Sequence, residues 1–171
     1  MTTLVHMCAN GMSLAPATDA EIEHVERNFR PGDRHEQEVA GAAGTPTRVD
    51  DFEDVWTVRI RGRIIGYVGV CVMPDVGSDA PVRGLCFMSC TETDRNRIAF
   101  VKDGREAMRF VVSQTPEHVE TFLAWPLASY GMSVKWQKRI LGFREAGRCD
   151  SGTPGEVYVV LETTRREVMN G

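Results

Sequence analysis

Three side chains in this sequence are candidates for proton transfer: the carboxyl groups of Asp33 and Glu36, three positions apart, and the phenol of Tyr130. Carboxyl and phenol groups act as general acids or bases when they lie within hydrogen-bond reach of a reacting atom. The two carboxyl groups also have a structural interpretation, because Arg30 and Arg34 lie close in sequence and oppositely charged residues three or four apart pair on a helix surface. On spacing alone, the ion-pair interpretation is the more economical one.

The five cysteines form no recognisable metal or disulfide motif. Cys86 and Cys90 are four positions apart in an apolar run, which on a strand would separate them by about 13 Å at 3.3 Å per residue. That is too far for one metal ion, and no Cys-x-x-Cys sequence occurs. We therefore expect no metal site, and we expect reduced thiols that pack as small hydrophobic residues.

The composition is typical of one globular domain: 171 residues, 42% hydrophobic and 26% charged, with a net charge of −4. We assign residues 1–12 to an N-terminal arm and residues 13–171 to the domain. Phosphate binding needs clustered Lys and Arg, so nucleic acid is not an expected partner. No apolar run has the roughly 20 residues of a membrane helix. The N-terminus also lacks the pattern of a signal peptide, so we expect neither a membrane span nor secretion by that route.

The hydrophobic pattern indicates the elements that position these side chains. Thr18-x-x-Glu21 matches a capping box, and apolar residues then recur at helical spacing, which predicts a helix over residues 19–29. Pro31 and Gly32 break this pattern, and a second short helix is expected over residues 33–40. The pattern further predicts strands over residues 55–60, 64–72, 85–90, 119–125 and 157–161, and a late helix over residues 133–141.

A central helix is expected between the strands at 85–90 and 119–125, which makes a βαβ unit with parallel strands and a right-handed crossover. Its predicted core stripe is Ile98, Val101, Met108 and Val112, with Ala107 and Val111 beside it. Gly104 interrupts this helix at a cost of about 1 kcal/mol relative to Ala. Since the preceding hairpin is antiparallel, the sequence predicts a mixed central sheet flanked by helices, of class α/β or α+β.

This order of elements resembles the GNAT superfamily of N-acyltransferases over roughly residues 13–162. The best local match is Ser133-Val-Lys-Trp-Gln-Lys-Arg-Ile-Leu-Gly-Phe143, which is similar to the late helix of that superfamily. Ala15-Pro-Ala-Thr-Asp-Ala-Glu-Ile22, Asn28 and Arg30-x-x-Asp33-x-x-Glu36 also resemble a subfamily of short-tailed phages, which includes an internal virion protein needed for core assembly. The resemblance implies a single GNAT-like domain and, for an active enzyme, acetyl-coenzyme A as the acyl donor.

The loop that would bind coenzyme A departs from the pattern of the superfamily. There, an Arg/Gln-x-x-Gly-x-Gly/Ala loop lets backbone N–H groups approach the pyrophosphate at a helix N-terminus. Residues 91–97 of this chain contain no glycine, and Glu92 and Asp94 would face the negative pyrophosphate. The candidates for contact with the cofactor are Thr93, Arg95, Asn96 and Arg97.

The late helix departs as well. Many GNAT enzymes carry a tyrosine five positions before the Leu-Gly-Phe phenylalanine, as the acid for the leaving thiolate, and Lys138 occupies that position here. Tyr130 could supply a phenol from another direction, and Asp33 and Glu36 are the candidate bases for an incoming amine.

Three hypotheses follow from the resemblance and its departures. Our main prediction is a non-catalytic bacteriophage protein that needs no cofactor and acts in assembly or inside the virion, with virion or host proteins as partners and oligomers allowed. It would be found in the host cytoplasm or the virion. The alternatives are an active acetyl-CoA-dependent N-acyltransferase and a host-directed binding or inhibitor protein. A fold alone never establishes chemistry, so binding of coenzyme A is the observation that separates them.

Overall fold

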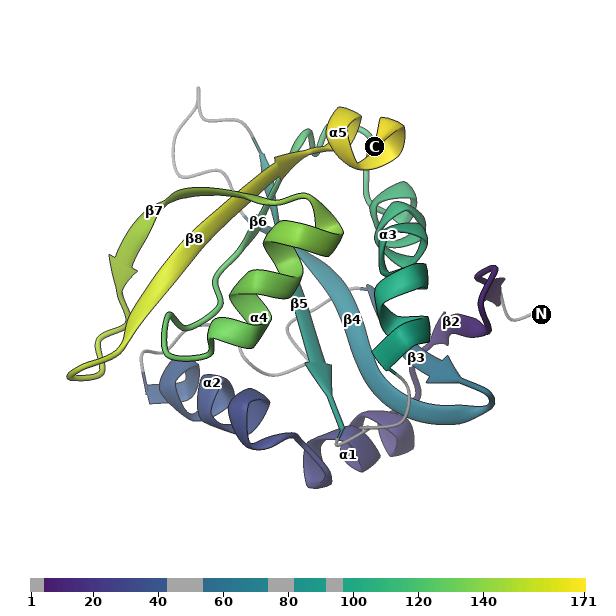
Figure 1. The fold of residues 1–171 in the computed structure, drawn as a ribbon, viewed down its shortest axis with the longest axis horizontal. Coiled ribbons are helices and arrows are strands. Elements are labelled where there is room, and N and C mark those ends of the chain that lie inside the picture. Colours follow the sequence, from purple (N-terminus) through teal and green to yellow (C-terminus); the bar gives the residue numbers. More distant parts are fainter. Residues whose placement is uncertain (1–4, 43–53, 74–81, 92–96) are drawn as a thin grey trace.

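The computed structural model describes residues 5–42, 54–73, 82–91 and 97–171. Within them lies an eight-stranded mixed sheet with the strand order β1-β2-β3-β4-β5-β6-β8-β7 (Figure 1). The strands are β1 (His6–Met7), β2 (Met12–Pro16), β3 (Asp54–Ile60), β4 (Arg63–Met73), β5 (Arg83–Cys90), β6 (Thr121–Ala124), β7 (Arg144–Asp150) and β8 (Val157–Thr164). The helices are α1 (Asp19–Arg27), α2 (Pro31–Ala42), α3 (Arg97–Gln114), α4 (Gly131–Trp136), the π-helical turn η3 (Gln137–Leu141) and α5 (Arg165–Asn170).

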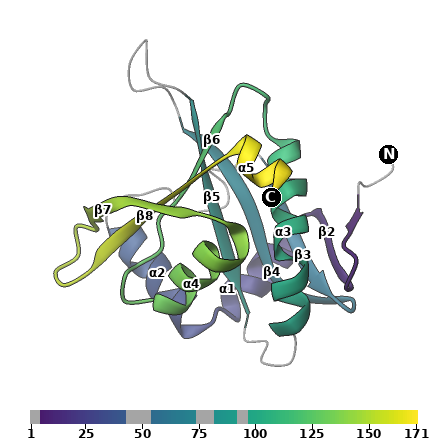
Figure 2. The same ribbon diagram turned by 45° about the horizontal axis from the view of Figure 1, so that its top comes forward.

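The expected mixed sheet is confirmed. β5 and β6 are parallel, and the other neighbouring strands are antiparallel. Together with α3 they form the predicted βαβ unit. Figure 1 and Figure 2 both show the β7–β8 hairpin projecting from the rest of the sheet. None of the described helices is long and apolar enough to span a membrane.

Helices pack on both faces of the sheet. On one face, Met108, Val111 and Val112 of α3 join the main core with Trp56 and Val58 of β3. On the other face, α1 packs against β4, where Val25 and Tyr67 form a second core. This alternation along the strands follows from the two-residue period of side-chain direction in a sheet. Both faces are therefore covered, as expected for a sheet flanked by helices.

The starts of α1 and α2 follow local sequence signals. The backbone N–H of Thr18 donates to the Glu21 carboxylate at 3.0 Å, as the capping box predicts. The same carboxylate pairs with Arg59 and accepts from the hydroxyl of Thr57, which ties α1 to β3. α2 begins at Pro31, two residues before the predicted start, because proline at the first helical position has no N–H to lose.

The predicted core stripe of α3 is wrong at its N-terminal end. Ile98 is 73% exposed and Val101 is 46% exposed, whereas Met108 and Val112 are buried as expected. The inward position of this part of the helix is taken by Asp103, which is fully buried. Its carboxylate accepts hydrogen bonds from the backbone, so a polar residue occupies a place that periodicity gives to apolar ones.

Residues assigned to the N-terminal arm contact the sheet. β1 pairs with β2 through His6 opposite Leu14, and Cys8 and Met12 are buried in the main core. The division of the chain into an arm and a domain stays a prediction.

Candidate functional site

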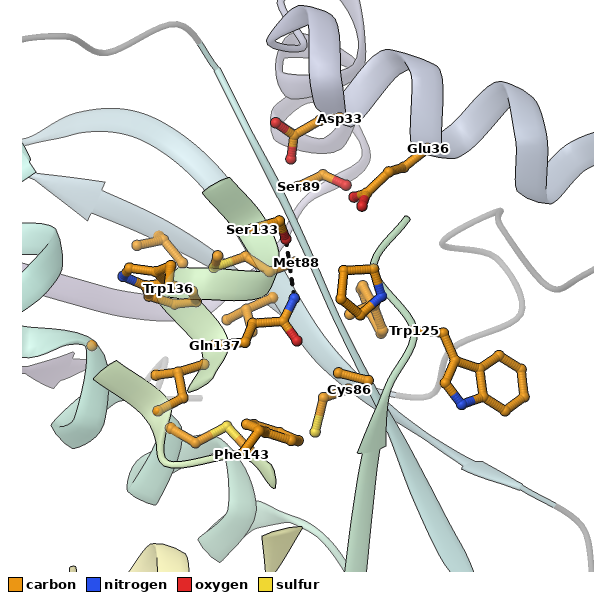
Figure 3. Close-up of a pocket in the computed structure, with 18 of the residues that line it drawn as sticks. Asp33, Glu36, Cys86, Met88, Ser89, Trp125, Ser133, Trp136, Gln137 and Phe143 are labelled. Carbon is orange, nitrogen blue, oxygen red and sulfur yellow. Dashed lines mark hydrogen bonds between the residues drawn. The ribbon is translucent and has the colours of Figure 1, made fainter. Parts of the chain in front are cut away.

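The parallel pairing of β5 and β6 is short and creates the opening for a site. It covers Arg83 to Leu85 on β5 and Thr121 to Leu123 on β6. Beyond it, β5 continues beside β4 as far as Cys90, whereas β6 ends at Ala124. A cavity of about 160 Å³ lies where the two strands part (Figure 3). Its walls include Asp33, Glu36, Met88, Trp125, Trp136 and Gln137.

The edge of β5 offers free backbone groups to this opening. The N–H of Cys90 donates to Asp33 at 3.2 Å, and its C=O accepts from the N–H of Arg30 at 3.0 Å, so both groups point away from β4. Because alternate residues of a strand direct their backbone groups to the same edge, Met88 presents its N–H and C=O to the side where the β6 ladder has ended. A ligand in the opening can bind these groups as an additional strand would.

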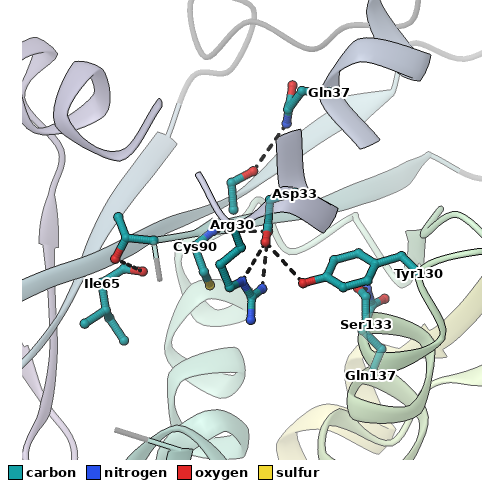
Figure 4. A network of polar contacts seen from close by, with 10 residues as sticks. Arg30, Asp33, Gln37, Ile65, Cys90, Tyr130, Ser133 and Gln137 are labelled. Atoms are coloured by element: carbon teal, nitrogen blue, oxygen red, sulfur yellow. Dashed lines mark hydrogen bonds and ion pairs between the residues drawn. The ribbon is translucent and has the colours of Figure 1, made fainter. Parts of the chain in front are cut away.

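Asp33 holds three elements together at one end of the site (Figure 4). The Nε of Arg30 donates to its Oδ2 at 2.6 Å, and the hydroxyl of Tyr130 donates to the same oxygen at 3.3 Å. The N–H of Cys90 and a second nitrogen of Arg30 donate to Oδ1. The predicted ion pair is thus present, but it is not on a helix surface, because Asp33 is only 3% exposed. The network joins α2, β5 and the segment before α4.

Glu36 is half-buried one helical turn along α2, and Figure 3 shows its carboxylate directed toward the cavity. Its Oε1 accepts the backbone N–H of Leu127 at 2.9 Å. Burial raises the pKa of Glu36 from 4.5 to about 7; the hydrogen bond from Leu127 opposes this rise and nearby Asp33 adds to it. A carboxyl group with a pKa close to neutrality is suited to general base catalysis, because it is partly ionised and still basic.

Tyr130 lies against α2. A Cβ atom on Gly32 would come within 2.5 Å of its ring, so only glycine fits beneath it. The guanidinium carbon of Arg30 stands 5.8 Å from the centre of the same ring. Burial raises the pKa of the Tyr130 phenol above its usual value, and Asp33 adds to the effect. The phenol therefore stays protonated at neutral pH and donates to Asp33.

The structure therefore brings Asp33, Glu36 and Tyr130 together, although Glu36 and Tyr130 are 94 positions apart. Asp33 and Glu36 line the cavity, and Tyr130 reaches the group through its bond to Asp33. Of the predicted cofactor contacts, Thr93, Arg95 and Asn96 lie outside the described residues. Arg97 is the first residue of α3.

Sequence reasoning missed the part of the site that comes from the late helix. Gln137 donates to the hydroxyl of Ser133 at 3.1 Å, and both residues line the cavity. η3 starts at Gln137, and π-helical turns are frequent at functional sites. The four-residue spacing of Ser133 and Gln137 predicts that both side chains lie on one face of a helix. The π-helical turn has no recognisable sequence pattern.

The cavity walls also contain buried polar atoms without partners. Among the described residues, these include the indole nitrogens of Trp125 and Trp136, the Oε1 of Gln137 and the hydroxyl of Tyr158. Buried polar atoms are nearly always hydrogen-bonded, so such a group indicates a site that a polar ligand or water completes. Trp125 and Trp136 are themselves half-buried at this site.

The fold is similar to those of solved acetyltransferases. The aminoglycoside acetyltransferase AAC(6')-Ib in complex with coenzyme A matches with a TM-score of 0.63 and 16% identity, covering 91% of this chain and 96% of that chain. The aminoglycoside N(6')-acetyltransferase from Legionella pneumophila subsp. pneumophila str. Philadelphia 1 matches with a TM-score of 0.62 and 12% identity, covering 93% and 95%. An uncharacterized protein from Bacillus halodurans matches with a TM-score of 0.65 and 12% identity, covering 99% and 93%.

No family model and no curated protein matches this sequence. At identities this low, a likeness between structures establishes the fold and leaves the chemistry to be argued from the site. The chain has the mixed α/β fold of the GNAT acetyltransferases.

Proposed function

We propose that this protein is an N-acyltransferase that moves an acetyl group from acetyl-coenzyme A to an amine. The observation that carries the proposal is Glu36, a half-buried carboxyl group with a pKa of about 7 on the wall of the cavity between β5 and β6. The bond from the Leu127 N–H occupies only Oε1 of this carboxyl group, which Figure 3 shows directed toward the cavity. The fold supports the proposal, because AAC(6')-Ib has been solved with coenzyme A bound.

This proposal places the acyltransferase, an alternative in the sequence analysis, ahead of the phage assembly role. AAC(6')-Ib and the Legionella protein are named as acetyltransferases, and neither is named as a virion protein. The phage assignment, the virion or host partners, the oligomeric state and the location stay predictions. The host-directed binding role also stays a prediction.

The donor would lie along the free edge of β5. Its chain contains amide groups that the backbone N–H and C=O groups of Met88 can bind, and Trp136 and Gln137 supply further unpaired polar atoms. Acetyl-coenzyme A brings the reactive thioester. Side chains would contact the phosphates of the donor, because the loop has no glycine whose backbone could approach them. The proposed contacts are Thr93, Arg95, Asn96 and Arg97.

In the proposed reaction, the amine nitrogen forms a bond to the acetyl carbon while the bond from that carbon to sulfur breaks. Glu36 accepts the proton that the amine loses, directly or through a water molecule. The leaving thiolate takes a proton from solvent. Both oxygens of Asp33 already accept hydrogen bonds from Arg30, so we assign Asp33 a positioning role. Tyr130 is assigned the same role, because its hydroxyl donates to Asp33.

Calorimetric titration with acetyl-coenzyme A and with free coenzyme A tests the proposal. We expect dissociation constants in the micromolar range and acetylated products when primary amines are added and examined by mass spectrometry. Arg95→Ala should weaken binding, and Arg61→Ala, in the turn between β3 and β4, is the matched control and should not. Absence of binding at millimolar donor would refute the proposal and restore the assembly role as the leading hypothesis.

A further inference from the structure

A second cluster of reactive side chains lies on the other side of α3, outside the cavity. His6 belongs to β1, Cys8 follows it in the turn to β2, and Glu106 comes from the middle of α3. One imidazole nitrogen, the thiol sulfur and one carboxylate oxygen all lie within 4.8 Å of one another. The Nε2 of His6 is 3.5 Å from the Oε1 of Glu106.

Core packing of Cys8 and the pairing of His6 with Glu106 are ordinary roles, but they do not require the three ligand atoms to converge. The Nε2 of His6 is shielded from water and makes no hydrogen bond. Cys8 is a free cysteine and is only 6% exposed. Glu106 uses its Oε2 to accept the N–H of Ala9 at 3.1 Å, which leaves Oε1 directed at His6. Nitrogen, sulfur and oxygen donors thus converge on one point.

We propose that His6, Cys8 and Glu106 bind one Zn²⁺ ion, with water as the fourth ligand. Zinc accepts this mixture of donors, and its bonds of about 2.0–2.3 Å place tetrahedral ligand atoms roughly 3.3–3.8 Å apart. The distance of 3.5 Å between His6 and Glu106 already satisfies this requirement, and small side-chain movements bring the Cys8 sulfur into place. The thiol proton leaves to solvent as the zinc–sulfur bond forms. The His6 and Glu106 side chains are 29% and 36% exposed, so solvent reaches two of the three ligand side chains.

The surrounding structure fixes the ligands in advance. The His6 ring stacks on Phe110 with 4.4 Å between ring centres. The turn that carries Cys8 is closed by a hydrogen bond of 2.8 Å from its N–H to the C=O of Met12, and Asp103 accepts the N–H of Asn10. Second contacts of this kind orient the ligands of metal sites. The bound metal would therefore fasten the N-terminal strand to α3.

The test uses the full chain after chelator treatment. Equilibrium dialysis should show one zinc ion per chain, and zinc at 100 times the dissociation constant should raise the melting temperature by roughly 5–10 °C. Co²⁺ in place of zinc should give the intense visible bands of a tetrahedral site and a thiolate charge-transfer band. Cys8→Ser should remove the charge-transfer band and weaken zinc binding at least tenfold, and His6→Phe, which keeps the stacking on Phe110, should also weaken it.

The matched control is Cys149→Ser, which removes an exposed thiol on β7 and should leave the cobalt spectrum unchanged. Circular dichroism checks the folding of each variant. If Cys8→Ser does not fold, the cobalt spectra of the wild type, Cys149→Ser and His6→Phe still test whether the metal binds at this cluster. An octahedral spectrum without a thiolate band, or full zinc binding by both Cys8→Ser and His6→Phe, would overturn the proposal.

Discussion

Replacing Glu36 by glutamine separates its chemical role from its structural one. The glutamine side chain would have nearly the same shape and keep an oxygen that can accept the Leu127 N–H, which donates at 2.9 Å in the wild type. It cannot accept the proton of an amine. We therefore expect Glu36→Gln to bind acetyl-coenzyme A normally and to lose about 10²–10⁴-fold in kcat/KM, the usual contribution of a general base. In the wild type, kcat/KM should rise with pH through about 7, and the variant should lack this limb.

The Glu36→Gln substitution should raise the stability of the fold, although it lowers activity. Burial raises the pKa of the folded-state carboxyl from 4.5 to about 7, so the fold favours the protonated form. The stabilisation of the fold by the protonated Glu36 carboxyl is complete below pH 4.5 and is lost as the pH rises through 7. At 1.36 kcal/mol for each pKa unit, ionised Glu36 destabilises the fold by up to about 3 kcal/mol at pH 8. Between pH 5 and pH 8, Glu36→Gln should gain about 2 kcal/mol of stability relative to wild type.

Urea denaturation at pH 5 and pH 8, followed by tryptophan fluorescence, measures this difference. Glu38→Gln is the matched control, because Glu38 is exposed on the same helix. Its stability relative to wild type should change little between the two pH values. If Glu36→Gln keeps its activity within threefold, with the same pH profile, then Glu36 is not the base. If its relative stability is the same at both pH values, the argument from burial is wrong.

Two other substitutions test the positioning network and the cavity wall. Tyr130→Phe removes the hydroxyl that donates to Asp33 at 3.3 Å, and we expect less than a tenfold loss in kcat/KM with an unchanged pH profile. A loss above 100-fold together with a missing alkaline limb would instead make Tyr130 the acid. Gly104→Ala should lower the melting temperature and weaken coenzyme A binding, because its Cβ would lie 3.2 Å from Trp136. Gly41→Ala, in open space at the end of α2, should stabilise by up to about 1 kcal/mol, and an equal gain at Gly104 would contradict this reasoning.

The sequence predicted elements wherever local patterns determine them. The capping box at Thr18, the hairpin of β3 and β4 and the parallel βαβ unit are visible in periodicity and turn residues, and the structure contains each of them. Gly104 shows where local reasoning stops. Its helix propensity marks it as a weak point, but its place against Trp136 and Ile140 shows that it allows α3 and the late helix to approach closely.

The site was predictable as a set of residues and not as an arrangement. Spacing on a helix places Asp33 and Glu36 one turn apart, but it does not reveal that one is buried in a network and the other directed into a cavity. That difference comes from β5 and from the segment before α4, which supply the Cys90 N–H and the Leu127 N–H. The raised pKa of Glu36 results from burial and is therefore a tertiary property.

The position of α3 depends on the N-terminal turn as much as on an apolar stripe. The carboxylate of Asp103 is fully buried and accepts hydrogen bonds from the N–H groups of Asn10 and Met12 at 3.0 Å each. Losing such partners would leave a buried charge unsatisfied, which is far more costly than exposing an apolar side chain such as Ile98. The turn therefore fixes the rotation of α3, and this rotation is what directs Gly104 and its neighbours into the cavity wall.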